Sequence, residues 1–240
     1  MTAGTNRISY AKIEDIARQI VALKNNYKIV LVSSGAIATA KQFIDISGYD
    51  KRVDSKQAMA AIGQPKLMKI YDEIFSSFGL KVAQCLMTYR DFENAISKTN
   101  TKHTLNKLLA HDYIPIINEN DTVAIEEIML GDNDKLSALV AVILEADLLV
   151  IASDIEGLYD QNPHLNKKAK LIKEVTNLER VKSFVKEKNS LLGTGGMTSK
   201  IQAARICAKE KVEMWIVDGG KNNFLINALQ DKISFTKFKA

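Results

Sequence analysis

Two clusters of polar side chains lie close together near the middle of the chain. Residues 118–121 (NEND) directly follow the apolar run 114–117, and residues 131–134 (GDND) end one residue before the largely apolar run 136–144. Asn, Asp and Gly are common turn formers, so a solvated loop is one interpretation. Because both clusters fall at the ends of apolar segments, the other interpretation is a binding crevice. We favour the crevice, lined by carboxylates and amides.

A glycine-rich run occupies residues 193–200 (GTGGMTSK) and opens a helix expected to continue to residue 209. Glycines let backbone N–H groups approach a phosphate, and the helix dipole adds about half a positive charge at that end. Lys200 would add a mobile full charge. The spacing is not the Walker pattern, in which Lys directly follows the last glycine. A phosphate site is therefore predicted, with a plain loop as the alternative.

Two further polar turns follow apolar runs. Residues 33–36 (SSGA) could cradle a polar ligand at a helix start, or Ser could simply cap that helix. Ser153 and Asp154 follow the run 148–152, where an Asp could contact a ribose or a phosphate-bound metal, or cap the turn. Neither motif decides between its two interpretations.

Elements that would position these side chains alternate along the chain. Apolar, partly β-branched runs predict strands at residues 28–33, 81–87, 113–118, 148–152 and 213–217. Segments of helical period predict helices at residues 9–25, 36–43, 55–78, 91–110, 135–145, 198–209 and 222–229.

This alternation predicts an α/β fold, a three-layer αβα sandwich around a mostly parallel sheet. Ligands bind beyond the carboxyl ends of strands in such sheets, where the polar clusters fall. With 240 residues and no repeat or Pro/Gly-rich linker, we expect residues 1–240 to form a single domain.

The composition argues against several classes of protein. No run approaches the roughly 18 apolar residues of a membrane span, and the N-terminus carries no signal-like apolar stretch. The net charge of +5 comes from dispersed lysines without an aromatic RNA-binding motif, so we expect neither nucleic-acid nor membrane partners. Cys85 and Cys207 lack metal-like spacing, and the histidines are scattered. We therefore expect no metal held by the protein and a cytoplasmic location.

Taken together, these segments resemble the glutamate kinase branch of the amino acid kinase family. The resemblance runs from about Asn6 to Thr236. Its most specific stretches are SSGAIA at residues 33–38, AAIGQ at 60–64 and IINENDTVAIEEIMLGDNDKLSAL at 116–139, with residues 193–200 as a further match. The long run is distinctive of the glutamate branch.

The resemblance implies roles for individual residues. Ser34, Asp121 and Asn133 would bind glutamate. Lys200 and Asp134 would be the catalytic residues, Lys200 neutralising the transferred phosphoryl group and Asp134 orienting lysines. The nucleotide would be bound by the following residues: Ser153, Asp154, Thr194, Gly195, Gly196, Met197, Thr198, Ser199 and Lys200.

The implied reaction is phosphorylation of the side-chain carboxylate of L-glutamate by ATP with Mg²⁺, giving glutamyl 5-phosphate at the first step of proline biosynthesis. A carboxylate with a pKa of about 4.3 is already ionised near neutral pH, so no general base is needed. The resemblance also implies a homo-oligomer and hand-over of the labile product to glutamyl-phosphate reductase. The alternatives are another substrate within the family, or a catalytically silent amino-acid sensor.

The sequence departs from the family at its N-terminus. The family begins with an apolar strand that ends in a lysine and a Gly-Ser/Thr turn contacting the ATP phosphates, and residues 1–7 correspond to the stretch after that turn. A late start codon, a truncation and a decayed paralogue are the three explanations, of which we favour the first. The C-terminal PUA domain of many relatives is also not found within the 240 residues.

Overall fold

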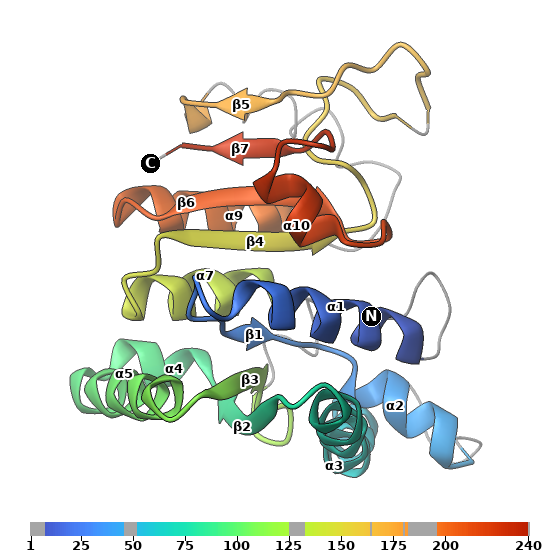
Figure 1. Cartoon of the computed structure of the whole chain (residues 1–240), viewed down its shortest axis with the longest axis vertical. Helices are drawn as coiled ribbons and strands as arrows, with labels where there is room; N and C mark the ends of the chain where they lie inside the picture. Colours follow the sequence, from blue (N-terminus) through green and yellow to red (C-terminus); the bar gives the residue numbers. More distant parts are fainter. Residues whose placement is uncertain are drawn as a thin grey trace. The chain divides into compact units, whose positions relative to one another are not determined.

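The computed structural model describes residues 8–45, 52–124, 133–163, 165–179, 181 and 196–239. The chain divides into two compact units, Met1–Asn133 and Asp134–Ala240 (Figure 1). Each unit has its own sheet and its own hydrophobic core.

The sheet of the first unit has three parallel strands in the order β1-β3-β2. They are β1 (Leu31–Val32), β3 (Tyr113–Glu119) and β2 (Lys81–Met87). The central strand, β3, is buried along almost its whole length, which explains its nearly continuous apolar sequence. All three strands point the same way, so their carboxyl ends lie at one edge of the sheet.

Five described helices surround this sheet. They are α1 (Tyr10–Leu23), α2 (Ala36–Phe43), α3 (Val53–Ser77), α4 (Tyr89–Glu93) and α5 (Ala95–Ala110). The long helix α3 contacts α1, α2 and β2, whereas α5 packs on β3. The core between them is built mainly from Ile and Leu of α1, α3 and β3, with Tyr71 and Phe75 at its centre.

Local side-chain chemistry explains where some of these helices begin. Thr88 and Asp91 form a capping box at the start of α4. The side chain of Asn94 accepts hydrogen bonds from the backbone N–H groups of Ile96 and Ser97, which starts α5 as a separate helix. The predicted helix 91–110 is therefore two helices.

Gly63 sets the distance between α2 and α3. A Cβ atom at this position would lie 1.9 Å from the carbonyl oxygen of Ala36 and 2.8 Å from the nitrogen of Ala40. Only glycine permits the backbones of the two helices to approach this closely. The AAIGQ motif thus has a packing function at its glycine.

The sheet of the second unit has four strands in the order β4-β6-β7-β5. They are β4 (Leu148–Ser153), β6 (Glu213–Asp218), β7 (Thr236–Phe238) and β5 (Glu174–Val175). The pairs β4/β6 and β5/β7 are parallel, and β6/β7 is antiparallel. The short strands β5 and β7 were not predicted from the sequence.

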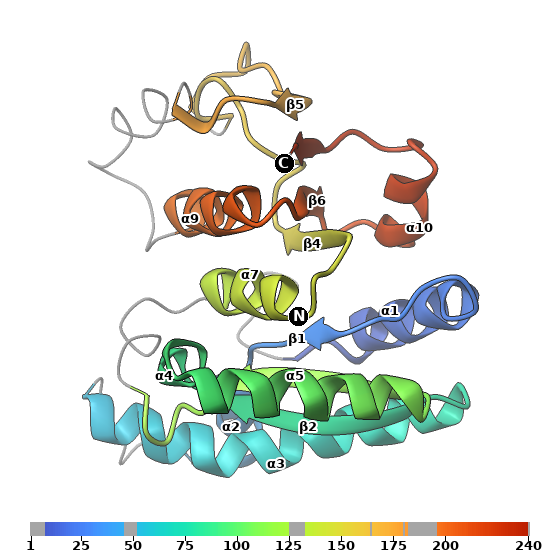
Figure 2. The same ribbon diagram turned by 90° about the vertical axis from the view of Figure 1, so that its left-hand side faces the viewer.

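The second unit also contains α7 (Asp134–Ile143), α9 (Gly196–Lys209) and α10 (Phe224–Leu229). Figure 2 shows α9 and α10 on opposite faces of this sheet, and α7 packs against α9. Thr236 ties β7 to two other segments, because its hydroxyl accepts from the N–H of Leu158 at 2.8 Å and donates to the carbonyl oxygen of Ile172 at 2.7 Å.

The structure confirms the predicted α/β class, with mostly parallel strands flanked by helices. The single-domain assignment stays a prediction. Among the described residues, no helix is both long and apolar enough to cross a membrane.

Candidate functional site

A network of hydrogen bonds joins the carboxyl ends of β1 and β3 in the first unit. Asn133 Nδ2 donates to the carbonyl oxygen of Ser33 at 2.6 Å and to Asn118 Oδ1 at 2.8 Å. Asn118 Nδ2 donates to Gln64 Oε1 at 2.8 Å, and the backbone N–H of Glu119 donates to Asn118 Oδ1. Both polar atoms of the Asn118 side chain are therefore engaged. They hold Asn133 where parallel α/β sheets bind ligands.

Tyr71 of α3 fixes the turn that follows β1. Its side chain is fully buried, and its hydroxyl lies 3.0 Å from Ser33 Oγ. Burial raises the pKa of Tyr71, and the hydrogen bond to Ser33 opposes this rise without cancelling it. The neutral phenol therefore holds the Ser33 hydroxyl near the start of α2.

The turn itself depends on Gly35, whose φ of +112° is rarely adopted by residues with a side chain. It leads directly into α2 and leaves the Ser34 side chain exposed. The first N–H groups of a helix have no partner within the helix. Ser34 therefore lies beside donors that can receive a polar or anionic group.

Two carboxylates adjoin a narrow cavity at the end of β3. The cavity has a volume of about 20 Å³, and Glu119 and Asp121 are among its lining residues. Removal from water, and secondly the nearby charge of Glu119, raise the pKa of Asp121 to about 6. The negative charge of Asp121 is thus unfavourable until a cation approaches it.

An ion pair in the second unit joins Asp134, the first residue of α7, to Lys200, the fifth residue of α9. Lys200 Nζ lies 2.9 Å from Asp134 Oδ2, and the two side chains are only 13% and 12% exposed. Ser199 Oγ donates to the same carboxylate oxygen at 2.7 Å. The glycine-rich run thus continues into a helix whose lysine is held by a carboxylate.

A second contact in this unit joins the loops that follow β4 and β6. Lys221 Nζ lies 2.5 Å from Glu156 Oε1, and the Tyr159 hydroxyl donates to Glu156 Oε2 at 3.0 Å. The hydrogen bond from Lys221 lowers the pKa of Glu156. Ser153 is the last residue of β4 and pairs in register with Asp218 of β6, and Asp154 begins the loop that contains Glu156. The loops at the carboxyl ends of both strands are therefore joined.

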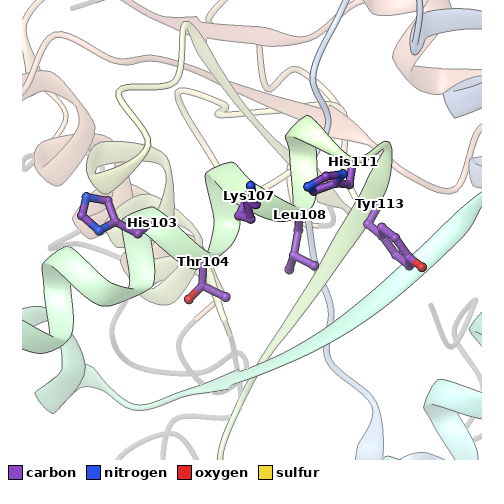
Figure 3. A pocket seen from close by; sticks show the side chains of 6 residues that line it. All are labelled: His103, Thr104, Lys107, Leu108, His111 and Tyr113. Atoms are coloured by element: carbon purple, nitrogen blue, oxygen red, sulfur yellow. The ribbon is translucent and has the colours of Figure 1, made fainter.

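A wider hollow of about 530 Å³ lies elsewhere in the first unit (Figure 3). Its lining comes from α5, the turn after it and the first residue of β3: His103, Thr104, Lys107, Leu108, His111 and Tyr113. Tyr113 begins β3, so this hollow lies at the amino ends of the parallel strands. Ligands of open α/β sheets bind at the opposite ends, so we place the candidate site at the polar clusters instead.

Comparison with known proteins identifies the family. The model of the amino acid kinase family matches residues 1–218. The chain belongs to the amino acid kinase family.

Relatives within the amino acid kinase family are similar along nearly the whole chain. The glutamate 5-kinase of Clostridium acetobutylicum is 42% identical over 240 residues, covering 99% of this chain and 90% of that protein. The glutamate 5-kinase of Thermus thermophilus is 42% identical over 238 residues, and the match spans 64% of its length. Among solved structures, UMP kinase from Ureaplasma parvum has a TM-score of 0.63 at 15% identity, covering 97% of this chain and 91% of that chain. That likeness concerns the amino acid kinase fold alone.

The residues predicted for the site fall in both units of this amino acid kinase. Ser34, Asp121 and Asn133 belong to the first unit, and Ser34 is exposed. Asp134, Ser153 and Asp154 belong to the second. So do the first residues of α9, which are Gly196, Met197, Thr198, Ser199 and Lys200. Thr194 and Gly195 lie outside the described residues. The functional roles of all these residues remain predictions.

Several residues that build the site were not assigned a role from the sequence. Gln64, Tyr71 and Glu119 organise the first unit, whereas Glu156 and Lys221 connect two loops of the second. Gln64 and Glu119 stand within motifs already recognised. No local signal marks Tyr71 or Lys221, because their partners are distant in sequence.

A magnesium ion would need oxygen ligands from the residues of this amino acid kinase. No group of three or more His, Cys, Asp or Glu side chains that could hold a metal ion occurs among the described residues. Magnesium in kinases is usually held by one or two carboxylates together with substrate phosphates and water. The carboxylates among the described residues fit an ion that arrives with ATP.

Proposed function

We propose that the chain transfers the γ-phosphoryl group of ATP to the side-chain carboxylate of L-glutamate, giving glutamyl 5-phosphate and ADP. The observation that carries this proposal is the Lys200–Asp134 ion pair at the start of α9. A fixed positive charge at a helix N-terminus suits phosphoryl transfer, which depends on positioning and charge neutralisation. Glutamate is chosen as substrate because the similar relatives carry the name glutamate 5-kinase.

In the proposed reaction, an oxygen of the substrate carboxylate attacks the γ-phosphorus. The new carboxylate–phosphorus bond forms as the bond from the γ-phosphorus to its bridging oxygen breaks, and ADP leaves with that oxygen. The carboxylate is already ionised, so no proton has to be removed. Lys200 would neutralise charge on the phosphoryl oxygens. Asp134 would act as a positioning residue by holding Lys200, and Ser199 supports it.

The residues proposed to bind glutamate offer polar groups that suit this substrate. Asn133 Oδ1 is buried and has no hydrogen-bond partner among the described residues, so it can accept from a substrate donor. Asp121 offers a carboxylate to the substrate ammonium group. Ser34 is exposed beside the start of α2, where hydroxyl and backbone donors can meet a substrate carboxylate.

The residues proposed for ATP occupy the second unit. Backbone groups of residues 194–200 would approach the phosphates, and Ser153 and Asp154 would line the remainder of the nucleotide site. The Glu156–Lys221 pair would keep the loop after β4 in place. Magnesium would enter with ATP and share the neutralisation of the phosphate charge.

The wider setting is also part of the proposal. Glutamyl 5-phosphate is an acyl phosphate, prone to hydrolysis, so we propose direct hand-over to glutamyl-phosphate reductase during proline biosynthesis. We further propose a cytoplasmic homo-oligomer. The test of the last point is the molar mass of the purified protein in solution.

The activity is tested with a substrate panel and ATP-Mg²⁺. The purified protein is incubated with L-glutamate, L-aspartate, N-acetyl-L-glutamate or UMP, and ADP release is followed. Acyl phosphate is trapped with hydroxylamine as the hydroxamate. We expect glutamate-dependent hydroxamate in the wild type and in Lys209→Ala, an exposed lysine of α9, but very little in Lys200→Ala.

The outcomes separate the competing functions. Turnover of another panel member would assign a different substrate within the family. Glutamate binding without any acyl phosphate would indicate an amino-acid sensor. Either result would refute the proposed function.

A further inference from the structure

Glu119, the last residue of β3, has a buried charge that the proposed reaction does not yet use. The residue is 2% exposed. Neither of its carboxylate oxygens has a hydrogen-bond partner among the described residues. An ionised carboxylate is costly to bury without a counter-charge or donors. We therefore expect the Glu119 carboxylate to bind a cation or a hydrogen-bond donor.

Glu119 lines the same narrow cavity as Asp121. The other lining residues are Ala60, Gln64, Leu86, Asn120 and Thr122, none of which carries a charge. The charge of Glu119 contributes to the raised pKa of Asp121. Two acidic residues therefore line one small space, and no lining residue carries a positive charge. The segment 125–132 that follows contains no Lys, Arg or His in its sequence.

The size of the cavity limits what can enter it. Its volume of about 20 Å³ slightly exceeds the roughly 10–15 Å³ needed to hold one water molecule. An ammonium group is of similar size to water, whereas an acetamido group is several times larger and uncharged. The neighbouring amide of Asn118 cannot readily replace the carboxylates, because its oxygen already accepts from Glu119 N–H and from Asn133.

We propose that Glu119, together with Asp121, binds the α-ammonium group of the substrate and makes the enzyme select amino acids with a free amino group. This inference rests on the proposed function and adds a specificity-determining residue to it. The two carboxylates together favour a cation more strongly than Asp121 alone. A substrate without that cation, such as glutarate, leaves both charges uncompensated. N-acetyl-L-glutamate leaves them uncompensated and is also too large for the cavity.

The experiment compares L-glutamate with glutarate, which keeps both carboxylates but lacks the amino group. Steady-state kcat and KM are measured for both substrates in wild type, Glu119→Gln, Glu119→Asp and Glu93→Gln. Glu93 is an exposed residue of α4, so Glu93→Gln makes the same chemical change away from the cavity. Thermal midpoints are recorded for all four proteins.

We expect Glu119→Gln to raise the KM for glutamate by about 30-fold, as for the loss of one partner of a buried charge pair. The ratio of kcat/KM for glutamate to that for glutarate should fall by a similar factor. The thermal midpoint of the unliganded protein should rise, because an unpaired buried charge is removed. Glu119→Asp should retain most of the preference, and Glu93→Gln all of it.

An unchanged glutamate-to-glutarate ratio in Glu119→Gln, with wild-type glutamate turnover intact, would overturn this inference and leave the proposed function standing. A wild type that neither binds nor phosphorylates glutamate would overturn both. Potassium chloride is compared with tetramethylammonium chloride at equal ionic strength. A rise in glutamate KM specific to potassium would assign the cavity to an inorganic cation and also overturn the inference.

Discussion

Replacing Lys200 by Ala tests the proposed mechanism most directly. The lysine and Asp134 are 2.9 Å apart and nearly buried, so their attraction is roughly 6 kcal/mol at an effective dielectric constant of about 20. Desolvation offsets part of this attraction, and loss of one partner of a buried pair typically costs about 3–5 kcal/mol of stability. We expect a loss of about 3 kcal/mol in the free energy of unfolding.

The effect on catalysis should be separate from the effect on folding. Loss of the ammonium group from the transition state should lower kcat by at least ~100-fold, equivalent to about 2.7 kcal/mol in the barrier. The affinity for glutamate should remain close to that of the wild type. We would measure kcat from ADP release at saturating substrates, well below the thermal midpoint, and stability by urea unfolding.

A double-mutant cycle with Asp134→Ala strengthens the test. Each single variant leaves one charge without its main partner, so the double variant should be less destabilised than the sum of the singles. Because Asp134 is proposed to act through Lys200, kcat of the double variant should equal that of Lys200→Ala. Normal kcat in Lys200→Ala, corrected for the folded fraction, would remove this lysine from the mechanism.

Three further predictions follow from the described contacts. The pKa of Asp121 is about 6, and a proton on its carboxylate competes with the substrate ammonium group, so the KM for glutamate should rise as the pH falls through about 6. If the pH profile of KM were no flatter in Asp121→Asn than in the wild type, this prediction would be wrong. Gly63→Ala should lower the free energy of unfolding, measured in urea, by at least about 2 kcal/mol, because its Cβ would meet the carbonyl oxygen of Ala36 at 1.9 Å. Gly196→Ala, where a Cβ would meet open space, is the control, and equal stability of the two variants would refute the close approach. Glu156→Gln should raise the KM for ATP by about 3–10-fold with glutamate KM unchanged, while this pair, whose side chains are 37% and 36% exposed, should contribute less than about 1 kcal/mol to stability. An unchanged ATP KM would make the contact with Lys221 irrelevant to the nucleotide site.

The four longer strands, β2, β3, β4 and β6, could be predicted from the sequence, apart from the last residue of three of them. β2 has the predicted bounds, but β3, β4 and β6 each continue one residue beyond the predicted end, through Glu119, Ser153 and Asp218. Apolar character marked the buried part of each strand, whereas backbone pairing continues into the first polar residue. These residues at the strand ends are also the ones nearest to the candidate sites.

Other elements were beyond the reach of sequence patterns. β5 and β7 have two and three residues, too few to show an alternation of side chains. β1 was predicted at residues 28–33, but only Leu31 and Val32 pair with β3. The division between α4 and α5 depends on the cap supplied by Asn94, which a helical period does not reveal.

For the site, residue types were predictable but their partners were not. The carboxylates and amides of residues 118–121 indicated a polar crevice, yet the contact of Asn118 with Gln64 spans 54 positions. In the sequence, Glu119 is one of four consecutive polar residues at positions 118–121 and does not stand out from its neighbours. Its burial without a partner depends on the packing of β3 and could be found only in the structure.

The position of β7 in its sheet has a consequence for how the protein is made. β7 lies between β6 and β5, and the described pairing of β5 is with β7 alone. During synthesis, β5 emerges from the ribosome long before residues 236–238 are available. Thr236 also forms hydrogen bonds with Leu158 and Ile172. This part of the second unit therefore cannot complete its contacts until the distant residues 236–238 have been synthesised. We expect it to fold late and to need protection from premature association until β7 is complete.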